Sequence, residues 1–114
     1  MNDEGRGAEG SGQFIRICSV QDVPEGSAKA FRVNGLAVAV YHSAGTFYAS
    51  EDICSHEHEH LSEGWLEGEV IECPRHGAQF SLKTGEALSL PATEPIRIFE
   101  VKVEGEDVLM AREG

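Results

Sequence analysis

Hydrophobic and polar residues alternate along short stretches of this sequence, and no long segment repeats its hydrophobic residues at helical spacing. Alternation with a period of two is typical of strands that bury one face, and turn residues bound each stretch here. The sequence therefore predicts an all-β protein. The expected strands cover residues 14–20, 31–33, 36–42, 46–49, 70–72, 78–82, 96–103 and 107–111.

The clearest local signal is the dipeptide Asn34-Gly35, which lies between two of these strands. Asn and Gly readily adopt the positive φ angles of a two-residue hairpin, so we predict a hairpin at this point. Residues 19–22 could cap a single helical turn before Pro24 stops it. It is the one helical turn that the sequence leads us to expect.

The length and composition suit one compact domain. The chain has 114 residues, of which 40% are hydrophobic, and this leaves no room for a second independent core. Residues 1–12 are acidic, rich in Gly and almost without large apolar side chains, so burial cannot offset the entropy lost on ordering them. We expect a flexible tail over residues 1–12 and a single domain over residues 13–112.

Charge and cysteine usage exclude several classes of function. A net charge of −11 argues against nucleic-acid binding, which needs Lys and Arg to displace counterions from phosphates. No apolar run approaches the roughly 20 residues of a membrane span, and the acidic start does not resemble a secretory signal. The three cysteines do not form the pattern of a disulfide framework. We therefore expect a cytoplasmic protein that binds neither membrane nor nucleic acid.

Two short motifs carry the candidate chemistry, Cys54-Ser55-His56 and Cys73-Pro74-Arg75-His76, with sixteen residues between them. Residues two apart in an extended segment project to the same side, so the cysteine and histidine of the first motif can address one centre. The proline of the second motif favours a tight turn in which its cysteine and histidine converge. We predict one metal centre between two facing loops. Its ligands are Cys54, His56, Cys73 and His76.

The order of these donors bears on which metal they bind. Zinc fingers usually take cysteines from one short spacing and histidines from another, whereas each motif here mixes the two. A cluster with two irons can place both thiolates on one iron and both imidazoles on the other, taking one of each from each loop. The mixed order argues against a zinc finger and is compatible with a cluster of two irons. A structural zinc site with the same four ligands is the alternative.

These motifs resemble those of the Rieske family, in which two histidines replace two cysteines on one iron of a [2Fe-2S] cluster. The resemblance runs from Phe14 to Met110 and includes Gly77 after the second motif. Residues 90–92 resemble the family's third loop, which covers the cluster from the side. The resemblance implies small antiparallel sheets with a two-loop cluster-binding subdomain at about residues 53–92, and one cluster per chain.

The sequence looks most like the small Rieske ferredoxins of bacterial aromatic-ring dioxygenase systems, including the segment 61–65 that follows the first motif. This resemblance implies a one-electron carrier and not an enzyme, with a flavin-dependent ferredoxin reductase upstream and a terminal ring-hydroxylating oxygenase downstream. We expect a monomer. A small subunit held permanently in a larger redox enzyme, such as nitrite reductase, is the alternative.

The chain departs from the respiratory members of the family at four positions. Where those proteins form a disulfide, this chain has Glu59 and Arg75, and where they place hydroxyl donors to the cluster sulfurs it has Ala78 and Phe80. Fewer donors leave the electron density on sulfur less stabilised. We therefore predict a reduction potential near the low end of the Rieske range of roughly −150 to +300 mV.

Acidic residues are dense around the two motifs, and they favour docking onto a basic partner surface. These acids are Glu57, Glu59, Glu63, Glu67, Glu69 and Glu72. Four other residues have less specific interpretations. We expect Trp65 to anchor packing beneath the first loop, Cys18 to be a buried apolar group, and His60, like His58, to be a solvated residue near the site.

Overall fold

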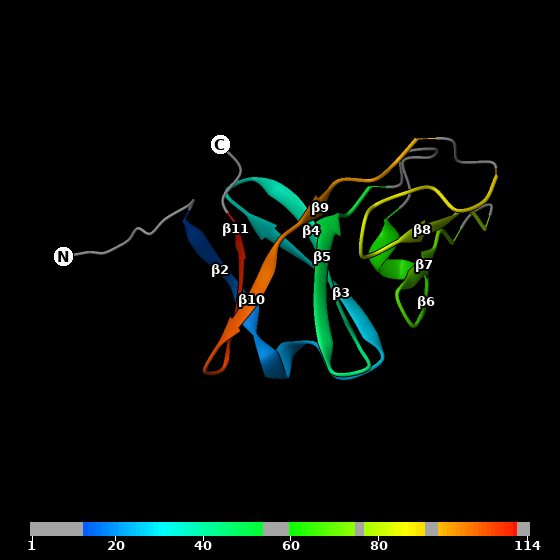
Figure 1. The fold of residues 1–114 in the computed structure, drawn as a ribbon. Helices are drawn as coiled ribbons and strands as arrows, with labels where there is room; N and C mark the ends of the chain where they lie inside the picture. The colour runs from blue at the N-terminus through cyan, green and yellow to red at the C-terminus, as the bar shows by residue number, and fades with distance from the viewer. Residues whose placement is uncertain (1–12, 54–59, 75–76, 91–93, 112–114) are drawn as a thin grey trace.

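The protein is all-β, as predicted, and its strands form three antiparallel sheets (Figure 1). The structure is a computed structural model, and it describes residues 13–53, 60–74, 77–90 and 94–111. Two short 3-10 helices, η1 (Val20–Asp22) and η2 (Leu61–Glu63), are the helical elements of these residues. Neither has the length or hydropathy that a membrane-spanning helix needs.

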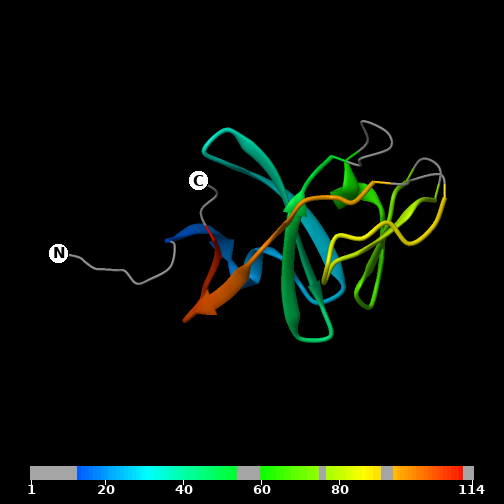
Figure 2. The same ribbon diagram turned by 45° about the horizontal axis from the view of Figure 1, so that its top comes forward.

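Each sheet has a simple strand order. The first sheet, in the order β10-β11-β2, contains β2 (Phe14–Ser19), β10 (Val101–Glu104) and β11 (Asp107–Ala111). The middle sheet, β3-β4-β5-β9, contains β3 (Ser27–Val33), β4 (Leu36–Ser43), β5 (Thr46–Glu51) and β9 (Ile98–Phe99). The third sheet, β6-β7-β8, contains β6 (Trp65–Glu67), β7 (Val70–Glu72) and β8 (Gln79–Ser81). Figures 1 and 2 show the third sheet at the end of the molecule away from β2 and β11, the first and last strands.

Strand β4 joins two hydrophobic cores because it is buried on both faces. The distal core contains Cys18, Val23, Val33, Val38, Val40, Ala49, Phe99, Val108 and Met110. The site core contains Ala39, Tyr41, Leu61, Ile71, Cys73, Ala78, Phe80, Leu82 and Ile96. Successive side chains of a strand project to opposite faces, so the continuous apolar run of β4 supplies Val38 and Val40 to one core and Ala39 and Tyr41 to the other.

The predicted hairpin is confirmed, and so is the helical turn. Asn34 and Gly35 have φ angles of 52° and 83°, and the strands on either side pair in full register from Val33 with Leu36 onward. The positive φ angles explain why this dipeptide is found here, since few other residues adopt them without strain. At η1 the backbone N–H of Ser19 donates to the Asp22 carboxylate at 2.9 Å.

Some strand boundaries were predicted wrongly. Strand β3 begins at Ser27, where residues of low strand propensity still pair with β4 along their whole length. The expected strand 96–103 is two strands, because β9 pairs with β5 of the middle sheet and β10 pairs with β11 of the first. Sequence reasoning also missed β6 and η2, which are three residues each and too short to show a period.

Candidate metal centre

The second motif begins where β7 ends, and its cysteine is fully buried. The backbone N–H of Cys73 donates to the carbonyl of Ala78 at 2.7 Å, and the N–H of Gly77 donates to the carbonyl of Cys73 at 3.2 Å. These bonds close the base of a tight turn. Gly77 has a φ of 76°, a left-handed conformation that glycine adopts without strain. The fourth predicted ligand, His76, lies outside the described residues.

The residues on either side of the first motif, which form the base of the predicted first loop, are also held together. Ile53 and His60 form an antiparallel bridge, and the N–H of Leu61 donates to the carbonyl of Asp52 at 3.1 Å. Cys54 and His56 lie between these ends and outside the described residues. The structure thus describes the base of this loop and of the second one, and directly describes one of the four predicted ligands.

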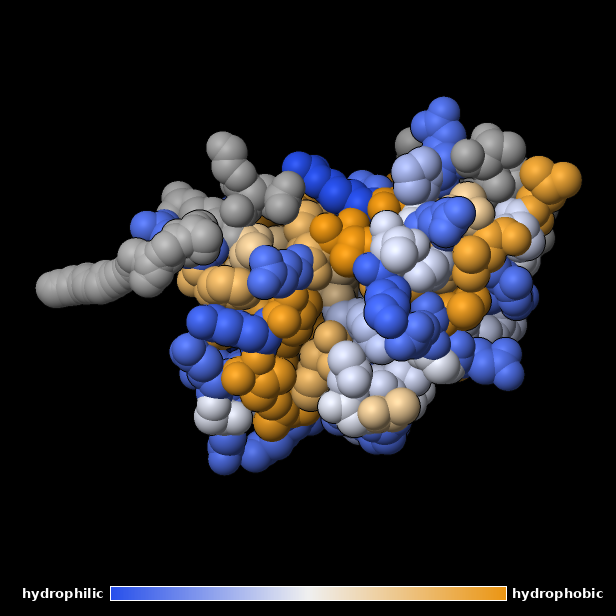
Figure 3. All heavy atoms as spheres, viewed as in Figure 1, coloured by the Kyte–Doolittle hydropathy of each residue, from blue (hydrophilic) through white to orange (hydrophobic). Residues whose placement is uncertain are grey.

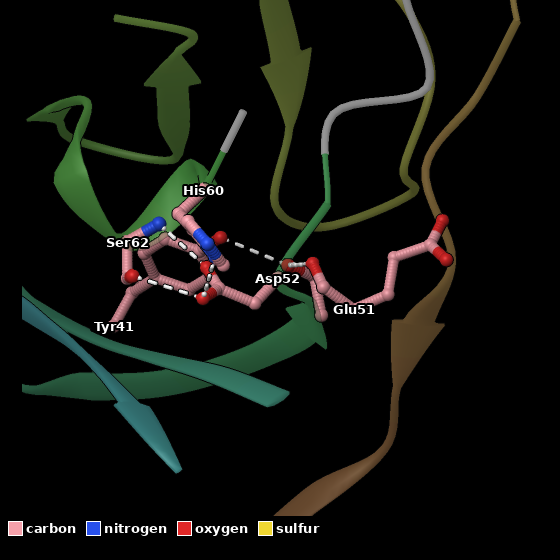
Figure 4. Close-up of polar contacts among 6 residues, drawn as sticks. Tyr41, Glu51, Asp52, His60 and Ser62 are labelled. Carbon is pink, nitrogen blue, oxygen red and sulfur yellow. Dashed lines mark hydrogen bonds and ion pairs between the residues drawn. The ribbon is translucent and has the colours of Figure 1, made fainter. Parts of the chain in front are cut away.

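A buried carboxylate ties the base of the first loop. The Asp52 side chain is 1% exposed and accepts hydrogen bonds from the Ser62 N–H at 2.7 Å and the Ser62 hydroxyl at 3.1 Å (Figure 4). Its third partner is Nδ1 of His60, at 3.1 Å. Burying a carboxylate is costly unless its oxygens are hydrogen-bonded, and these three contacts meet that need. We call Asp52, His60 and Ser62 the Asp52 clamp.

Strand β5, which leads into the first loop, is held by hydrogen bonds to its neighbour β4. The N–H of Asp52 donates to the carbonyl of Ala37 at 3.0 Å, and the hydroxyls of Tyr41 and Ser50 hydrogen-bond at 2.8 Å. Burial raises the pKa of Tyr41, so its hydroxyl stays neutral and able to donate. The end of β5 is therefore held in place by polar contacts as well as by packing.

The bases of the two loops share one core. Leu61, directly after the first loop, packs in the same buried cluster as Cys73 and Ala78 of the second. The backbones also meet, since a Cβ on Gly64 would overlap the carbonyl oxygen of Glu72. This close approach requires glycine at position 64. The two motifs thus start from neighbouring points, as a site built from both requires.

The surroundings of Cys73 fit an iron–sulfur ligand. Thiolates are the ligands that such clusters prefer, and Ala78 and Phe80 of the same core are both fully buried and carry no hydroxyl. Residues 13–53, 60–74, 77–90 and 94–111 contain no group of three or more metal-binding side chains. A complete site would therefore need the predicted ligands that lie outside these residues.

The predictions for three single residues near or outside the site have different outcomes. Trp65 does not pack beneath the loop but is 62% exposed, because it stands on the solvent face of the edge strand β6. Cys18 is buried as expected, and burial raises the pKa of its thiol to about 11. The His60 side chain is 55% exposed but is hydrogen-bonded to Asp52 and not simply solvated. Sequence reasoning missed Asp52, although its place two residues before Cys54 was a signal.

Comparison with known proteins agrees with this geometry. Residues 13–112 match the Rieske [2Fe-2S] domain family. The chain is 46% identical over 97 residues to the 3-phenylpropionate/cinnamic acid dioxygenase ferredoxin subunit of Escherichia coli (strain K12). The aligned residues cover 84% of this chain and 91% of that one.

Solved structures give the same result. The ferredoxin of Sphingomonas yanoikuyae B1 is 31% identical with a TM-score of 0.83, over 89% of this chain and all of that one (100%). A chain in the complex of reduced oxygenase and oxidized ferredoxin in carbazole 1,9a-dioxygenase is 41% identical with a TM-score of 0.78, over 86% of this chain and 92% of that one.

This chain belongs to the Rieske [2Fe-2S] family. Within that family it is a ferredoxin, which carries a [2Fe-2S] cluster and acts as an electron-transfer component and not as the catalytic subunit. The predicted fold class, cofactor and resemblance are confirmed. The zinc alternative is set aside, because the family's cofactor is the iron–sulfur cluster.

Proposed function

We propose that this ferredoxin passes single electrons from a flavin-dependent reductase to a terminal ring-hydroxylating oxygenase, in the cytoplasm and as a monomer. The observation that carries the proposal is its 46% identity to the ferredoxin subunit of an aromatic-acid dioxygenase, over 91% of that protein. The proposed cluster ligands are Cys54, His56, Cys73 and His76. The cluster-binding subdomain covers about residues 53–92 of a domain at residues 13–112.

The bound cluster supplies the one-electron oxidation and reduction. The role of the chain is to hold the cluster through its proposed ligands, close to a partner. Cys73 lies in an apolar core that excludes water, and the Asp52 clamp ties the base of the loop that carries Cys54 and His56. Fixed surroundings reduce the rearrangement that accompanies a change of charge on the cluster.

The reduction potential follows from the same surroundings. Ala78 and Phe80 are fully buried in the core that contains Cys73, and neither can donate a hydrogen bond from its side chain. We expect a potential near the low end of the range of roughly −150 to +300 mV that Rieske centres cover. Protein-film voltammetry measures it, and a value well above zero would contradict this expectation.

The negative charge around the proposed cluster site supports a partner with a basic surface. Glu63, Glu67 and Glu69 are exposed in the described part of this region, and the whole chain has a net charge of −11. Complementary charges speed the encounter of two proteins and are screened by salt. Electron-transfer rates to the oxygenase should therefore fall as ionic strength rises. Rates that do not depend on salt would remove the electrostatic part of the proposal.

Spectroscopy of the purified chain tests the ligand set. Absorption and electron paramagnetic resonance spectra before and after dithionite should show a reducible Rieske cluster with mixed sulfur and nitrogen ligation. Replacing His56 or His76 by Ala should abolish it, whereas His42→Ala, in the middle sheet, should leave it intact. A chromophore that survives loss of either proposed histidine ligand would refute the assignment.

A permanent subunit of a larger enzyme is the competing arrangement. The two arrangements differ in copurification, since a free carrier elutes as a small monomer whereas a subunit remains with its enzyme. Size-exclusion chromatography of the untagged protein from its native cells makes the distinction. Elution at the mass of a single 12.3 kDa chain supports the carrier, and elution in a large complex supports the subunit.

A further inference from the structure

Among the described residues, most of the exposed large hydrophobic side chains lie at the end of the molecule that holds the third sheet. The four that are most exposed are Trp65 at 62%, Leu88 at 47%, Leu90 at 77% and Val103 at 44%. The first three belong to the third sheet or to the segment beside it, and the fourth lies in β10 of the first sheet. Figure 3 shows hydrophobic surface at this end of the molecule among strongly hydrophilic residues.

Strand register places Trp65 and Leu88 in one row. Trp65 pairs with Glu72, Glu72 pairs with Gln79, and the N–H of Leu88 donates to the carbonyl of Gln79 at 2.7 Å. Leu88 also follows the antiparallel bridge of Phe80 with Ala87, which puts it opposite Gln79. We call this row, Trp65, Glu72, Gln79 and Leu88, the Trp65 row.

All four side chains of the Trp65 row belong to the solvent face of the sheet. Paired residues of antiparallel strands project to the same face, and Nε2 of Gln79 donates to Oε1 of Glu72 at 3.2 Å, which confirms it for this pair. The next row has the opposite orientation, and its members Ile71 and Phe80 are fully buried in the site core. A solvent-facing row with apolar side chains at its two ends, Trp65 and Leu88, thus lies directly over the core beneath the cluster loops.

The Trp65 row crosses the sheet at the end from which the second loop starts. Glu72 immediately precedes Cys73, and Gln79 immediately follows Ala78, whose carbonyl closes the turn. Leu90 follows two residues after Leu88 and is the most exposed of the large hydrophobic side chains. A protein bound on this row would therefore contact residues adjacent to a proposed cluster ligand.

We propose that the Trp65 row, with Leu90, is the surface on which the terminal oxygenase docks, through apolar side chains of the oxygenase that are flanked by its own Lys and Arg side chains. The inference rests on the proposed function and names the surface that it uses. Single exposed hydrophobic residues are normal, but several on one face among polar groups are typical of a protein contact. Tryptophan is among the residues that contribute most to such contacts.

Charge around the row determines the kind of partner surface. Glu67, two residues after Trp65 in β6, projects from the same face, and Glu72 lies within the row itself. Glu69 is exposed in the following turn. Lys83 is the one Lys or Arg among described residues 60–74 and 77–90. Acidic side chains within and beside a row that has apolar ends match a partner surface with the reverse charge.

The test uses the holoprotein with the reductase and oxygenase of the Escherichia coli 3-phenylpropionate/cinnamic acid dioxygenase system as probes. Product formation is measured against ferredoxin concentration for the wild type, Trp65→Ala and Leu88→Ala. Val103→Ala is the matched control, since it removes an exposed hydrophobic residue from the first sheet. Voltammetry of each variant reports whether the cluster itself is altered.

We expect Trp65→Ala to raise the KM for ferredoxin about tenfold, as loss of a tryptophan that makes many contacts does, with kcat almost unchanged. Leu88→Ala should raise KM by a smaller factor, and Val103→Ala should have no effect. The reduction potential should be the same in all four proteins. The rate at which the reductase alone reduces the cluster should stay within about twofold of the wild-type rate in each variant.

Each contrary result has a distinct meaning. An unchanged KM for Trp65→Ala, with an active wild type, overturns the docking surface and leaves the proposed function standing. An equal loss in the reductase step assigns the surface to the reductase and overturns the choice of oxygenase. A shifted potential means that Trp65 acts on the cluster and not on the partner. A wild type that dithionite reduces but that delivers no electrons to the oxygenase defeats the proposed function and the docking surface with it.

Discussion

The two cores of this protein are built differently, although they share strand β4. The buried members of the distal core have neither hydroxyl nor charged groups, whereas the site core includes the hydroxyl of Tyr41 and borders the Asp52 clamp. Apolar packing supplies stability but little directional constraint, while satisfied buried hydrogen bonds fix geometry. The difference indicates that stability resides mainly in one core and positioning in the other.

The largest contrast should come from the two buried cysteines, one in each core. Cys73→Ala should abolish cluster binding, because it removes a proposed ligand. Cys18→Ala should retain the full cluster, because its thiol only packs in the distal core. Iron and acid-labile sulfide per chain measure the outcome. A full cluster content in Cys73→Ala would disprove the ligand assignment.

A cavity in the distal core should affect stability without affecting the cluster. Phe99 is buried there, and Phe99→Ala should lower the free energy of unfolding by about 3 to 5 kcal/mol. Chemical denaturation measures the loss, and voltammetry on the folded fraction should give the wild-type potential. A large shift of the potential would show that the two cores do not divide these roles.

The Asp52 clamp should behave in the opposite way. Asp52→Ala leaves the N–H and hydroxyl of Ser62 without their acceptor, which should cost about 1 to 3 kcal/mol. It should also broaden or shift the electron paramagnetic resonance signal, since the base of the first loop is released. The control is Asp107→Asn, which removes the charge of an exposed carboxylate in the first sheet. A signal identical to that of the wild type would mean that the clamp only stabilises the fold.

The smallest effect is expected at Glu25, far from the site. Backbone N–H groups of Gly45 and Ala44 hydrogen-bond its carboxylate and hold its pKa below the usual range. A lowered pKa means that the ionised group stabilises the fold above the unfolded-state pKa, and that this is lost as pH falls through the folded pKa. Glu25→Gln should therefore melt slightly below wild type at neutral pH and equal it in acid. Thermal melts across pH give the comparison, and a gap that widens in acid would reverse the expected sign.

Sequence reasoning was most reliable where a physical requirement is local. The Asn34-Gly35 turn was predictable because two adjacent φ angles decide it, and the apolar run of β4 was predictable because burial needs it. The two motifs were found for the same reason, since cysteine and histidine at short spacing have few other uses. The family and cofactor followed from those motifs.

It failed where distant parts of the chain decide the structure. The exposed position of Trp65 depends on β6 being an edge strand of the third sheet, and three residues carry no period that reveals this. The role of Asp52 depends on Ser62, ten positions later, meeting it at the base of a loop. The break at Glu100 arises because two different sheets need partners from one segment.

Strand β4 has a consequence for how the molecule comes apart. Because each of its faces covers a different core, neither core can lose its packing without exposing a strand on which the other depends. The protein should therefore melt in a single step, and the amides of β4 should be the slowest to exchange with deuterated water. Loss of the cluster should then also destabilise the distal core, because β4 belongs to both cores.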